Sequence, residues 1–590
     1  MMITSSSIGT LVVFICSIIF VIYPVSFPVL IPYPKRKRVN IHVNLTTAPI
    51  IAIAILWAAQ CIGPRDIRNG IVGIDGVKPY NILILFFSLA YMAITLDITG
   101  VLQAAAFWVS NKGGSNGWKL FFYFYIMLTV LSVFLGNDPV ILSGTAFLVY
   151  YTKVTELEPI SWLMSEFAAA NTASMVLFVG NPTNVVICEG FRVNNAAFTA
   201  YTILPFLACS LTCLIALGFQ FRSSKFLPRR LNNAGDLDVR SVLLDPTGAW
   251  VGSLLLGSCL VVIIVVSFFH VDVWKISLPF AAAKFIYDLA WDHYRFVNKI
   301  PMLGKHHKRQ KSEEDIIEAE DELVLEELQH RKDGLLKVPI EKTASPHSST
   351  RTDRSVTFEE DSEPLTASGI HTRVNTRQNT EDTYVDTGTQ VPAPVTTLGD
   401  EKQQPPSKIR AFYTSRYAKL STHFPTLFTA LPRLPFALVP FAFSQFILIE
   451  GLSHQGWIDV FANWLVLASK REMIPTIWLV GVLGVILCNI SGTNIGATIL
   501  LTKVVRSSSM PDHSARAAAI ALAVASNIGA VSFTFSASLA GLLWKQILEQ
   551  KGIFIKQRTF AFWNALPLLV MTAVGLGVVC AEMKVLYRNA

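Results

Sequence analysis

Long apolar runs, interrupted by short polar stretches, recur along most of this 590-residue chain. A membrane-spanning helix needs about 20 predominantly apolar residues, and such runs would supply about 10–12 of them. The pattern therefore predicts an all-α, polytopic membrane protein. The expected spans are residues 8–32, 45–63, 80–97, 118–135, 161–188, 198–220, 247–269, 273–292, 427–449, 474–490, 514–545 and 560–582.

Four further apolar stretches are too short or too broken to cross a bilayer. We expect them to form interfacial helices and re-entrant hairpins, two elements in each half of the chain. They are residues 100–110, 136–152, 456–468 and 493–506.

The same polar residue types interrupt the apolar pattern in both halves of the chain. A helix in lipid can be broken only where a neighbouring segment or a water-filled cavity satisfies the freed backbone groups. Paired interruptions in two halves are typical of a transporter's binding site. The interrupted segments are residues 136–139, 171–174 and 180–184 in the first half, and 491–496, 526–529 and 536–538 in the second.

The spacing of these segments indicates an internal duplication. Asn137 follows Gly100 by 37 positions, and Thr493 follows Gly456 by the same number. In each half the next polar segment then begins 33 or 34 positions further along the chain. We therefore expect two copies of one structural unit.

The composition supports a membrane protein and divides the chain into five parts. Hydrophobic residues make up 52% of the chain and charged residues only 15%, which is unusual for a soluble domain. Between 296 and 422 the chain becomes polar, so we expect a disordered Ser/Thr/charged linker there. The predicted parts are an N-terminal membrane helix with a basic loop (1–44), a first transmembrane repeat (45–246), the start of a second repeat (247–295), the linker (296–422) and the remainder of the second repeat (423–590).

The charges and cysteines narrow the possible functions. The net charge of +8 is carried by loops beside apolar runs, where basic residues usually mark the cytoplasmic side, so nucleic-acid binding is not expected. The eight cysteines lie in or beside apolar segments. Cys209 and Cys213 would share one helix face, but no His or carboxylate completes a metal-ligand set there. With no nucleophile–base pair evident, we expect no enzyme, no metal and no cofactor.

The first-half segments have the chemistry of a binding site. Pro139 after Asn137 and Asp138 would break a helix, and helix ends at such a break attract anions or cations. Asp138 is either functional or a helix cap. Asn and Thr side chains, as in 180–184, can both donate and accept hydrogen bonds without a fixed charge.

Two other acidic residues precede the glycines of the repeat. Asp97 lies just before Gly100, and Glu450 lies before Gly456. Each, like Asp138, is a candidate for coupling to protons or other ions, and each could equally be a hydrogen-bonded helix end.

The order of these motifs resembles the ion transporter superfamily, most closely its arsenite-pump (ArsB) and NhaD antiporter branch, which overlaps the citrate-transporter-like domain. The resemblance covers both halves but not the first forty residues or the linker. It implies two inverted repeats, each with a re-entrant hairpin and a broken helix that meet near the membrane midplane. The resemblance rests on residues 96–100, 136–138, 171–174, 180–184 and 526–544.

By this resemblance, solute contacts fall on Asn/Thr-rich segments of both halves. The chain departs from the family pattern in the second half: residues 493–496 lack an Asn-Asn-Pro sequence, and 533–536 lack an acid and a Thr-Pro pair. The implied substrate-binding residues are Asn137, Asp138, Asn181, Thr183, Asn184, Thr493, Asn494, Asn527 and Ser538.

The leading hypothesis is a secondary active transporter that moves a small anion or a metalloid oxyacid by alternating access. The expected partners are the lipid bilayer, the anion and a coupling H⁺ or Na⁺, with a possible homodimer. The expected location is the plasma membrane or a vacuolar or other organellar membrane. The alternatives are a sodium/proton-type cation antiporter, and a non-transporting scaffold that signals through the 296–422 insert.

Overall fold

The computed structural model describes residues 4–31, 37–74, 76–231, 237–266, 269, 271–300 and 408–588. It describes their side chains except at 29–31, 37–39 and 408–415. Most of this part of the chain is helical, and its only sheet is a two-stranded antiparallel hairpin. The predicted all-α fold class is confirmed.

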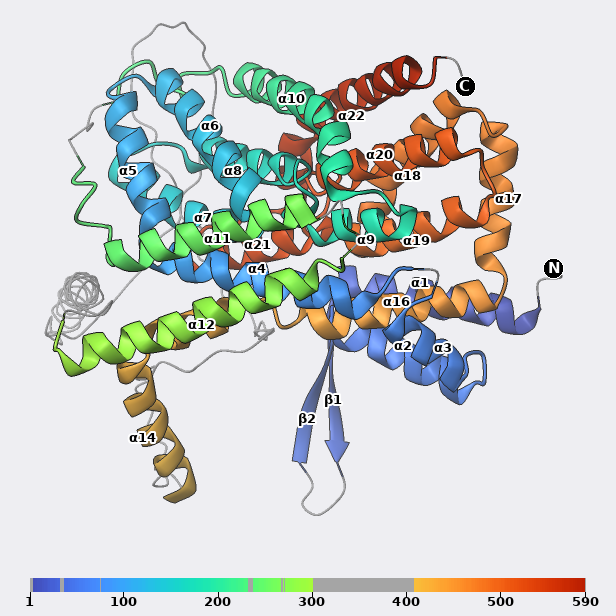
Figure 1. Cartoon of the computed structure of the whole chain (residues 1–590), viewed down its shortest axis with the longest axis horizontal. Helices are drawn as coiled ribbons and strands as arrows, with labels where there is room; N and C mark the ends of the chain where they lie inside the picture. The colour runs from blue at the N-terminus through green and yellow to red at the C-terminus, as the bar shows by residue number, and fades with distance from the viewer. Residues whose placement is uncertain are drawn as a thin grey trace, which may run out of the picture. The chain divides into compact units, whose positions relative to one another are not determined.

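The elements form four groups along the chain (Figure 1). The N-terminal group comprises α1 (Ser5–Ile22), β1 (Val25–Ile31), β2 (Lys37–Val43), α2 (Thr47–Ala58) and α3 (Pro64–Val72). A first series comprises α4 (Pro79–Ile98), α5 (Val101–Gly113), α6 (Gly117–Leu135), α7 (Asn137–Val154), α8 (Pro159–Ala173), the 3₁₀ turn η1 (Phe178–Gly180), α9 (Pro182–Phe191) and α10 (Asn195–Gln220).

A middle group follows, and then a second series. The middle group comprises α11 (Pro246–Val266), α12 (Trp274–Val297), α14 (Lys408–His423), α15 (Pro425–Ala430) and η3 (Leu431–Arg433). The second series comprises α16 (Leu438–His454), α17 (Trp457–Ser469), α18 (Met473–Ile490), α19 (Asn494–Ser507), α20 (Asp512–Ile528), η4 (Phe535–Ala537), α21 (Leu539–Gln550) and α22 (Gln557–Leu586).

The two series repeat one order of elements, so that α4 to α10 correspond to α16 to α22. Helices α5 and α17 each follow a left-handed glycine, Gly100 with φ of 87° and Gly456 with φ of 80°. Gly136 and Gly492, with φ of 81° and 83°, likewise precede α7 and α19. The matched backbone supports the duplication predicted from the spacing.

The two series also pack on each other reciprocally. Helix α7 of the first series packs on α21 of the second, and α19 packs on α9. The corresponding helices α10 and α22 pack on each other (Figure 1). This exchange of partners is the pattern of an approximate two-fold relation between the series. The inversion of the second repeat stays a prediction.

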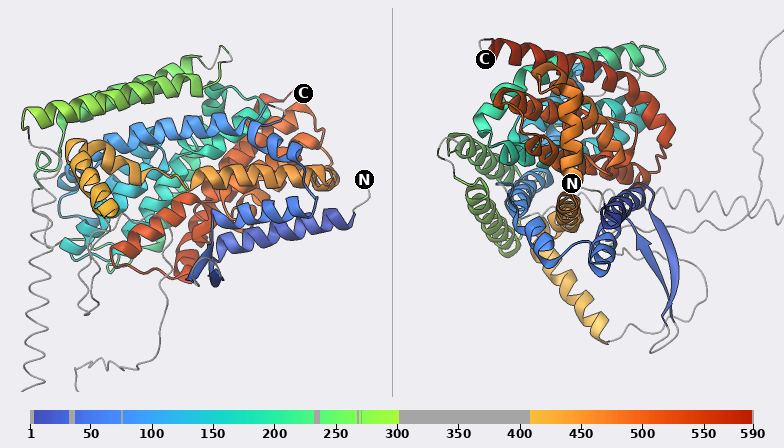
Figure 2. Two further views of the ribbon diagram at one scale, coloured as in Figure 1. Left: turned by 90° about the horizontal axis from the view of Figure 1, so that it is seen from below. Right: turned by 90° about the vertical axis from the view of Figure 1, so that its right-hand side faces the viewer.

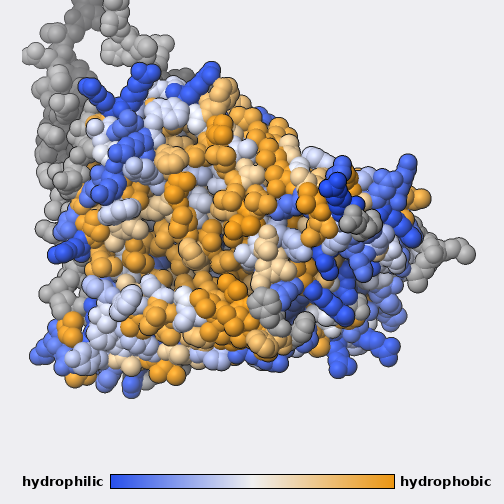
Figure 3. Space-filling model, turned by 45° about the horizontal axis from the view of Figure 1, so that its top comes forward, coloured by the Kyte–Doolittle hydropathy of each residue, from blue (hydrophilic) through white to orange (hydrophobic). Residues whose placement is uncertain are grey.

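The outer surface of the helices is suited to lipid. Leu211, Ile215 and Phe219 on α10 are 59–61% exposed, and Figure 3 shows a broad apolar area on one face of the molecule. Such an area is unfavourable in water. Within the described residues, eight helical segments are long and apolar enough to span a membrane. They are α1, α4, α6, α10, α11, the α15–α16 segment, α18 and α22.

The chain is therefore an integral, multi-pass membrane protein. Counting the interrupted segments α8–α9 and α20–α21 with those eight gives ten spans, the lower end of the expected range. Helix α2 has only 12 residues, and α12 carries charged residues along its length. This is why neither stands among the eight.

The first expected span, residues 8–32, is shorter than predicted. Helix α1 ends at Ile22, and the chain continues into the β1–β2 hairpin, in which Val25 pairs with Val43. Pro24 explains the helix end, because a proline disfavours helical conformation at the residue before it. The length of an apolar run alone could not reveal this change from helix to strand.

Helix α12 carries a buried polar face that the sequence pattern did not reveal. Lys284 forms an ion pair with Asp288, which also accepts a hydrogen bond from the Tyr91 hydroxyl of α4 (2.9 Å). Arg295 pairs with Asp245 at 3.3 Å. Buried charges are tolerated only when paired and hydrogen-bonded, so these contacts hold α12 against α4 and α11.

The two chain segments that flank residues 301–407 are joined to each other. Asp292 of α12 accepts hydrogen bonds from the backbone amide (2.9 Å) and the hydroxyl (3.0 Å) of Thr426 at the start of α15. Ring nitrogens of His293 and His423 lie 2.8 Å apart. The predicted linker 296–422 thus begins within α12 and ends within α14, and its residues 301–407 lie outside the described residues.

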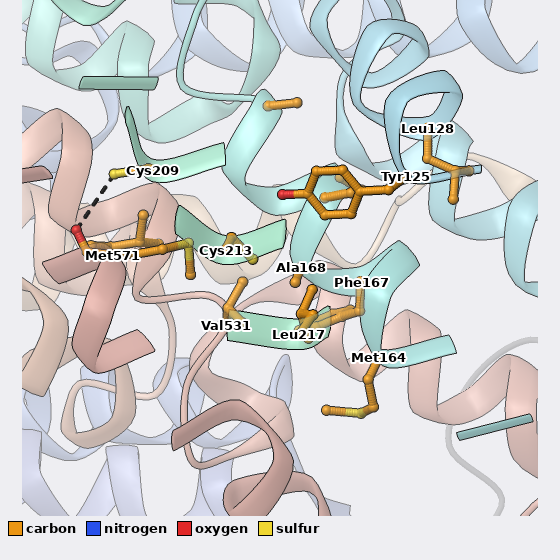
Figure 4. Close-up of a cluster of buried hydrophobic side chains, with 14 of the residues drawn as sticks. Tyr125, Leu128, Met164, Phe167, Ala168, Cys209, Cys213, Leu217, Val531 and Met571 are labelled. Carbon is orange, nitrogen blue, oxygen red and sulfur yellow. Dashed lines mark hydrogen bonds between the residues drawn. The ribbon is translucent and has the colours of Figure 1, made fainter. Parts of the chain in front are cut away.

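Apolar side chains of both series share one core (Figure 4). Phe167 of α8 and Met571 of α22 are fully buried in it. The Tyr125 hydroxyl of α6 donates to the carbonyl of Ser210 on α10 (2.9 Å). The Cys209 thiol lies 3.5 Å from the carbonyl of Met571. The core therefore joins α10 to α22 through side chains as well as helix contacts.

The left-handed glycine before α5 provides a test of this fold. A Cβ on Gly100 would lie 2.0 Å from the carbonyl oxygen of Val242, and its φ of 87° disfavours any other residue. We expect Gly100→Ala to cost about 1–3 kcal/mol of stability, measured as a lower thermal midpoint in detergent. Gly257→Ala on α11, with open space around it, is the control and should leave the midpoint unchanged or raise it slightly, because alanine favours a helix over glycine. Equal midpoints for both variants would contradict the assigned conformation.

Candidate functional site

The first interruption lies between α8 and α9, where the sequence places a break. The extended residue Asn181 (φ −151°, ψ 141°) caps α9, and its side-chain oxygen accepts hydrogen bonds from the amide (3.1 Å) and the hydroxyl (3.0 Å) of Thr183. Pro182 occupies the first helical position, where its missing amide costs nothing. A Cβ on Gly180 would lie 2.4 Å from the Ser174 carbonyl oxygen, so only glycine fits this bend.

The second interruption, between α20 and α21, has the same backbone form without a proline. Ser538 is extended (φ −148°, ψ 157°), and its hydroxyl accepts a hydrogen bond from the Gly541 amide (3.0 Å). Upstream, the Asn489 side-chain oxygen accepts from the amide and the hydroxyl of Thr534, each at 3.1 Å. At this interruption, the Ser538 cap and the Asn489 side chain of α18 satisfy the backbone at the break and start the next helix, as Asn181 and Pro182 do in the first half.

A buried hydrogen-bond network connects the two interruptions. The Ser174 hydroxyl bonds to the Asn527 side-chain oxygen (2.8 Å), and the Asn527 amide donates to the Asn184 side-chain oxygen (2.8 Å). The Ser526 hydroxyl lies 3.3 Å from the Thr183 hydroxyl. All five side chains are at most 1% exposed. Residues more than 340 positions apart therefore form one polar centre.

The expected hairpin helices α7 and α19 begin beside this centre. The side-chain amide of Asn137 donates to the side-chain oxygen of Asn171 at 3.0 Å. In the second half, the side-chain amide of Asn494 donates to the backbone carbonyl oxygen of Ser526 at 3.1 Å. Thr493 caps α19 through a hydrogen bond from the Gly496 amide (3.4 Å). Each hairpin helix thus starts against the interruption of its own half.

The acidic candidates occupy different surroundings. Asp138 lies half-buried in the first turn of α7, and no hydrogen bond or ion pair joins it to another described residue. Asp97, at the end of α4, lies 3.3 Å from Arg433, and Glu450 forms an ion pair with Lys503. Two of the three proposed coupling residues therefore have a cationic partner outside the polar centre.

One residue of this region was not singled out from the sequence. Gln445 on α16 is fully buried, and neither its amide nor its carbonyl oxygen has a hydrogen-bond partner among the described residues. A Cβ on Gly496, in the first turn of α19, would lie 3.3 Å from that carbonyl oxygen. A side-chain amide within the predominantly apolar helix α16 was the available signal.

The polar centre brings neutral hydrogen-bonding side chains and the N-termini of several helices together in one buried region. Helices α7, α9, α19 and α21 all begin at the interruptions or beside them. Free amides and the dipole at a helix N-terminus favour an anion or another electron-rich solute. Asn, Ser and Thr side chains add both donors and acceptors. Such a centre can bind a small oxygen-rich solute without a fixed positive charge.

The fold and its polar centre define a polytopic membrane protein with paired interrupted helices, the design found in membrane transporters. Residues 6–299 match the model of a family described as a citrate transporter, and residues 423–580 match that of an arsenical pump membrane protein. The chain belongs to the ion transporter superfamily, in the branch that contains these two families. The descriptions of both families name transport proteins and not enzymes.

Individual relatives agree with this assignment. An arsenical pump membrane protein of Escherichia coli is 24% identical over 219 residues, which are 35% of this chain and 50% of the relative. The P protein of Mus musculus is 26% identical over 178 residues, 30% of this chain and 21% of that protein. A 46 kDa membrane protein of Mycobacterium leprae is 24% identical over 208 residues, 35% and 47% of the two chains. The chain thus spans about half or less of the length of these relatives.

The bond between Asn184 and Asn527 predicts a measurable coupling. Removing either side chain leaves a buried polar group without its partner, at a cost of about 1–3 kcal/mol. We expect Asn184→Ala and Asn527→Ala together to cost about 1 kcal/mol less than the sum of the single changes, measured by unfolding in detergent micelles. Asn298→Ala, an exposed residue that bonds only within its own helix end, serves as control. Strict additivity would contradict the contact.

Proposed function

We propose that this protein is a secondary active transporter for a small anion or a metalloid oxyacid. The observation that carries the proposal is the buried network from Ser174 through Asn527 to Asn184, which joins the two interrupted helices. In an ordinary protein core, the position between the two interrupted helices would be filled with apolar side chains. Here it is filled with amides and hydroxyls that can exchange their bonds for bonds to a solute.

The chemistry of the centre favours oxygen-rich solutes over bare cations. Sites for divalent cations in proteins are usually rich in carboxylates, and of the residues assigned to the centre only Asp138 is acidic. Amides and hydroxyls suit both a carboxylate and an uncharged metalloid acid with its own hydroxyl groups. The proposed contacts are Asn137, Asp138, Asn181, Thr183, Asn184, Thr493, Asn494, Asn527 and Ser538, to which Gln445 is added.

Alternating access supplies the mechanism. The solute would replace bonds between the two series, for example the bond between Ser526 and Thr183 (3.3 Å), and so loosen one series from the other. The paired hairpins α7 and α19 would then expose the centre to opposite sides in turn. A proton or sodium gradient would drive the cycle, with Asp97, Asp138 and Glu450 as the coupling candidates.

A cation antiporter is the second candidate, and one observation favours it. Asp138 lies in the first turn of α7 without a hydrogen bond or ion pair to another described residue, and an intramembrane carboxylate without a partner is a common proton carrier. Transport of sodium or lithium that fails in Asp138→Asn and needs no anion would favour this function over the first.

Transport by the purified protein tests the main proposal. Proteoliposomes would be loaded in turn with arsenite, antimonite, citrate and succinate under an imposed proton or sodium gradient. We expect at least one solute to be transported, and Asn181→Ala with Thr183→Ala to reduce its initial rate by about tenfold or more, as for two lost hydrogen bonds. Absence of transport for every solute and gradient would refute the proposal.

Replacement of Gln445 separates a binding role from a packing role. Leucine has nearly the same volume and removes a buried unsatisfied amide, so Gln445→Leu should preserve or raise the thermal midpoint. We expect transport to fall by about tenfold because the solute loses a hydrogen-bonding contact. Gln103→Leu, at an exposed position on α5, is the control. Unchanged transport with unchanged stability would exclude Gln445 from the site.

A further inference from the structure

A second polar region lies away from the interrupted helices, at the far end of α19. A cavity of about 340 Å³ opens between α3, α16 and α19, with α16 lying between the other two helices (Figure 1). Its size falls in the range of small-molecule sites. We define it as the α16–α19 cavity; its polar lining is Asn69, Glu450, Ser453, Thr502, Lys503, Arg506 and Ser507.

The charges that line the α16–α19 cavity are predominantly positive. Lys503 is paired with Glu450, whereas Arg506 forms no ion pair with any described residue. Asp459 lies nearby but bonds to Ser507 (2.8 Å) and is not part of the lining. The lining itself therefore carries two cationic side chains and one carboxylate, in a place where a second anion could share Lys503 with Glu450.

A buried hydroxyl gives an independent indication of a ligand. Thr502 is 1% exposed, and its hydroxyl has no hydrogen-bond partner among the described residues although it borders the α16–α19 cavity. Such a group normally finds a partner in the protein or in water. The guanidinium of Arg506 presents a planar set of donors to an oxyanion, and the enclosed Thr502 hydroxyl could join it after a rotation of its side chain.

The walls of the cavity are held by close helix contacts. A Cβ on Gly70 of α3 would lie 2.6 Å from the Ile447 Cα on α16. A Cβ on Gly190 of α9 would lie 2.4 Å from the methyl group of Thr502. The cavity is thus a built feature of the fold, and its α19 wall touches the helix that follows the first interruption.

We propose that the α16–α19 cavity binds a small multivalent anion, a di- or tricarboxylate or an inorganic oxyanion, through Arg506, Lys503 and Thr502. Lys503 follows Asn494 by nine positions, so the cavity lies roughly 14 Å along α19 from the polar centre, at 1.5 Å per residue. This position suits an antechamber that concentrates the anion before it reaches the interrupted helices. The antechamber role rests on the proposed function, whereas anion binding in the cavity does not.

Binding to the full-length protein in detergent tests the proposal. Citrate, inorganic phosphate and sulfate would be titrated calorimetrically at low ionic strength. We expect at least one of them to bind, and Arg506→Gln to weaken its affinity by roughly tenfold because a charged hydrogen bond is lost. The double change Glu450→Gln with Lys503→Gln, which leaves no charge unpaired, should weaken it similarly. No binding of any of the three anions would overturn the proposal.

Two comparisons make the result specific. Lys545→Gln with Glu549→Gln removes an exposed ion pair of the same kind (3.5 Å) and should leave anion affinity unchanged; an equal loss would show a nonspecific charge effect and overturn the proposal. Repeating the titration in nanodiscs with phosphatidylglycerol distinguishes a free anion from a lipid headgroup. Competition by the lipid would assign the cavity to headgroups and also overturn it.

Binding and transport together separate this site from the polar centre. The Asn181→Ala and Thr183→Ala changes should reduce transport by about tenfold or more while anion binding in the cavity persists. Arg506→Gln should raise the KM of transport and leave its maximal rate nearly unchanged. Loss of binding in the Asn181 and Thr183 variants would place the measured anion in the polar centre and refute the α16–α19 cavity as its site.

Discussion

The whole arrangement depends on one constraint, which is that backbone groups freed by a break in a membrane helix must be hydrogen-bonded within the protein. At the first interruption, the side-chain amide of Asn184 donates to the backbone carbonyl oxygens of Ser174 and Leu177, each at 2.9 Å. The other end of the same side chain accepts from Asn527. One asparagine therefore both closes the break in its own helix and ties it to the second series.

Because such side chains bond both within their own series and to the other series, the two series are joined by buried hydrogen bonds as well as by helix packing. Each hairpin helix begins against its own interruption and packs on a helix of the other series. Any movement that opens the polar centre must break bonds in both series at once. The buried Asp288 and Asp292 contacts of α12 hold a separate group of helices together.

The sequence predicted the interruptions because their residues are locally unusual. Gly180, Pro182 and the left-handed Gly100 each impose a backbone geometry that can be inferred from their own chemistry. The partners of these residues could not be inferred. Nothing in the order of residues indicates that Asn184 meets Asn527, 343 positions away, or that Glu450 pairs with Lys503, 53 positions away, because these contacts depend on how separate helices pack. Gln445 was missed although its amide in an apolar run was a local signal, because its burial without a hydrogen-bond partner depends on the packing of α16.

The bridge between α12 and α15 has a consequence for how this chain tolerates change. Asp292 and Thr426, with His293 and His423 beside them, join the last turns of α12 to the end of α14 and the start of α15. The entropy of closing a loop between fixed points grows only slowly with its length. The contacts that fix α12 to α15 lie entirely within the described helices, so they do not depend on the length of the chain between residues 301 and 407.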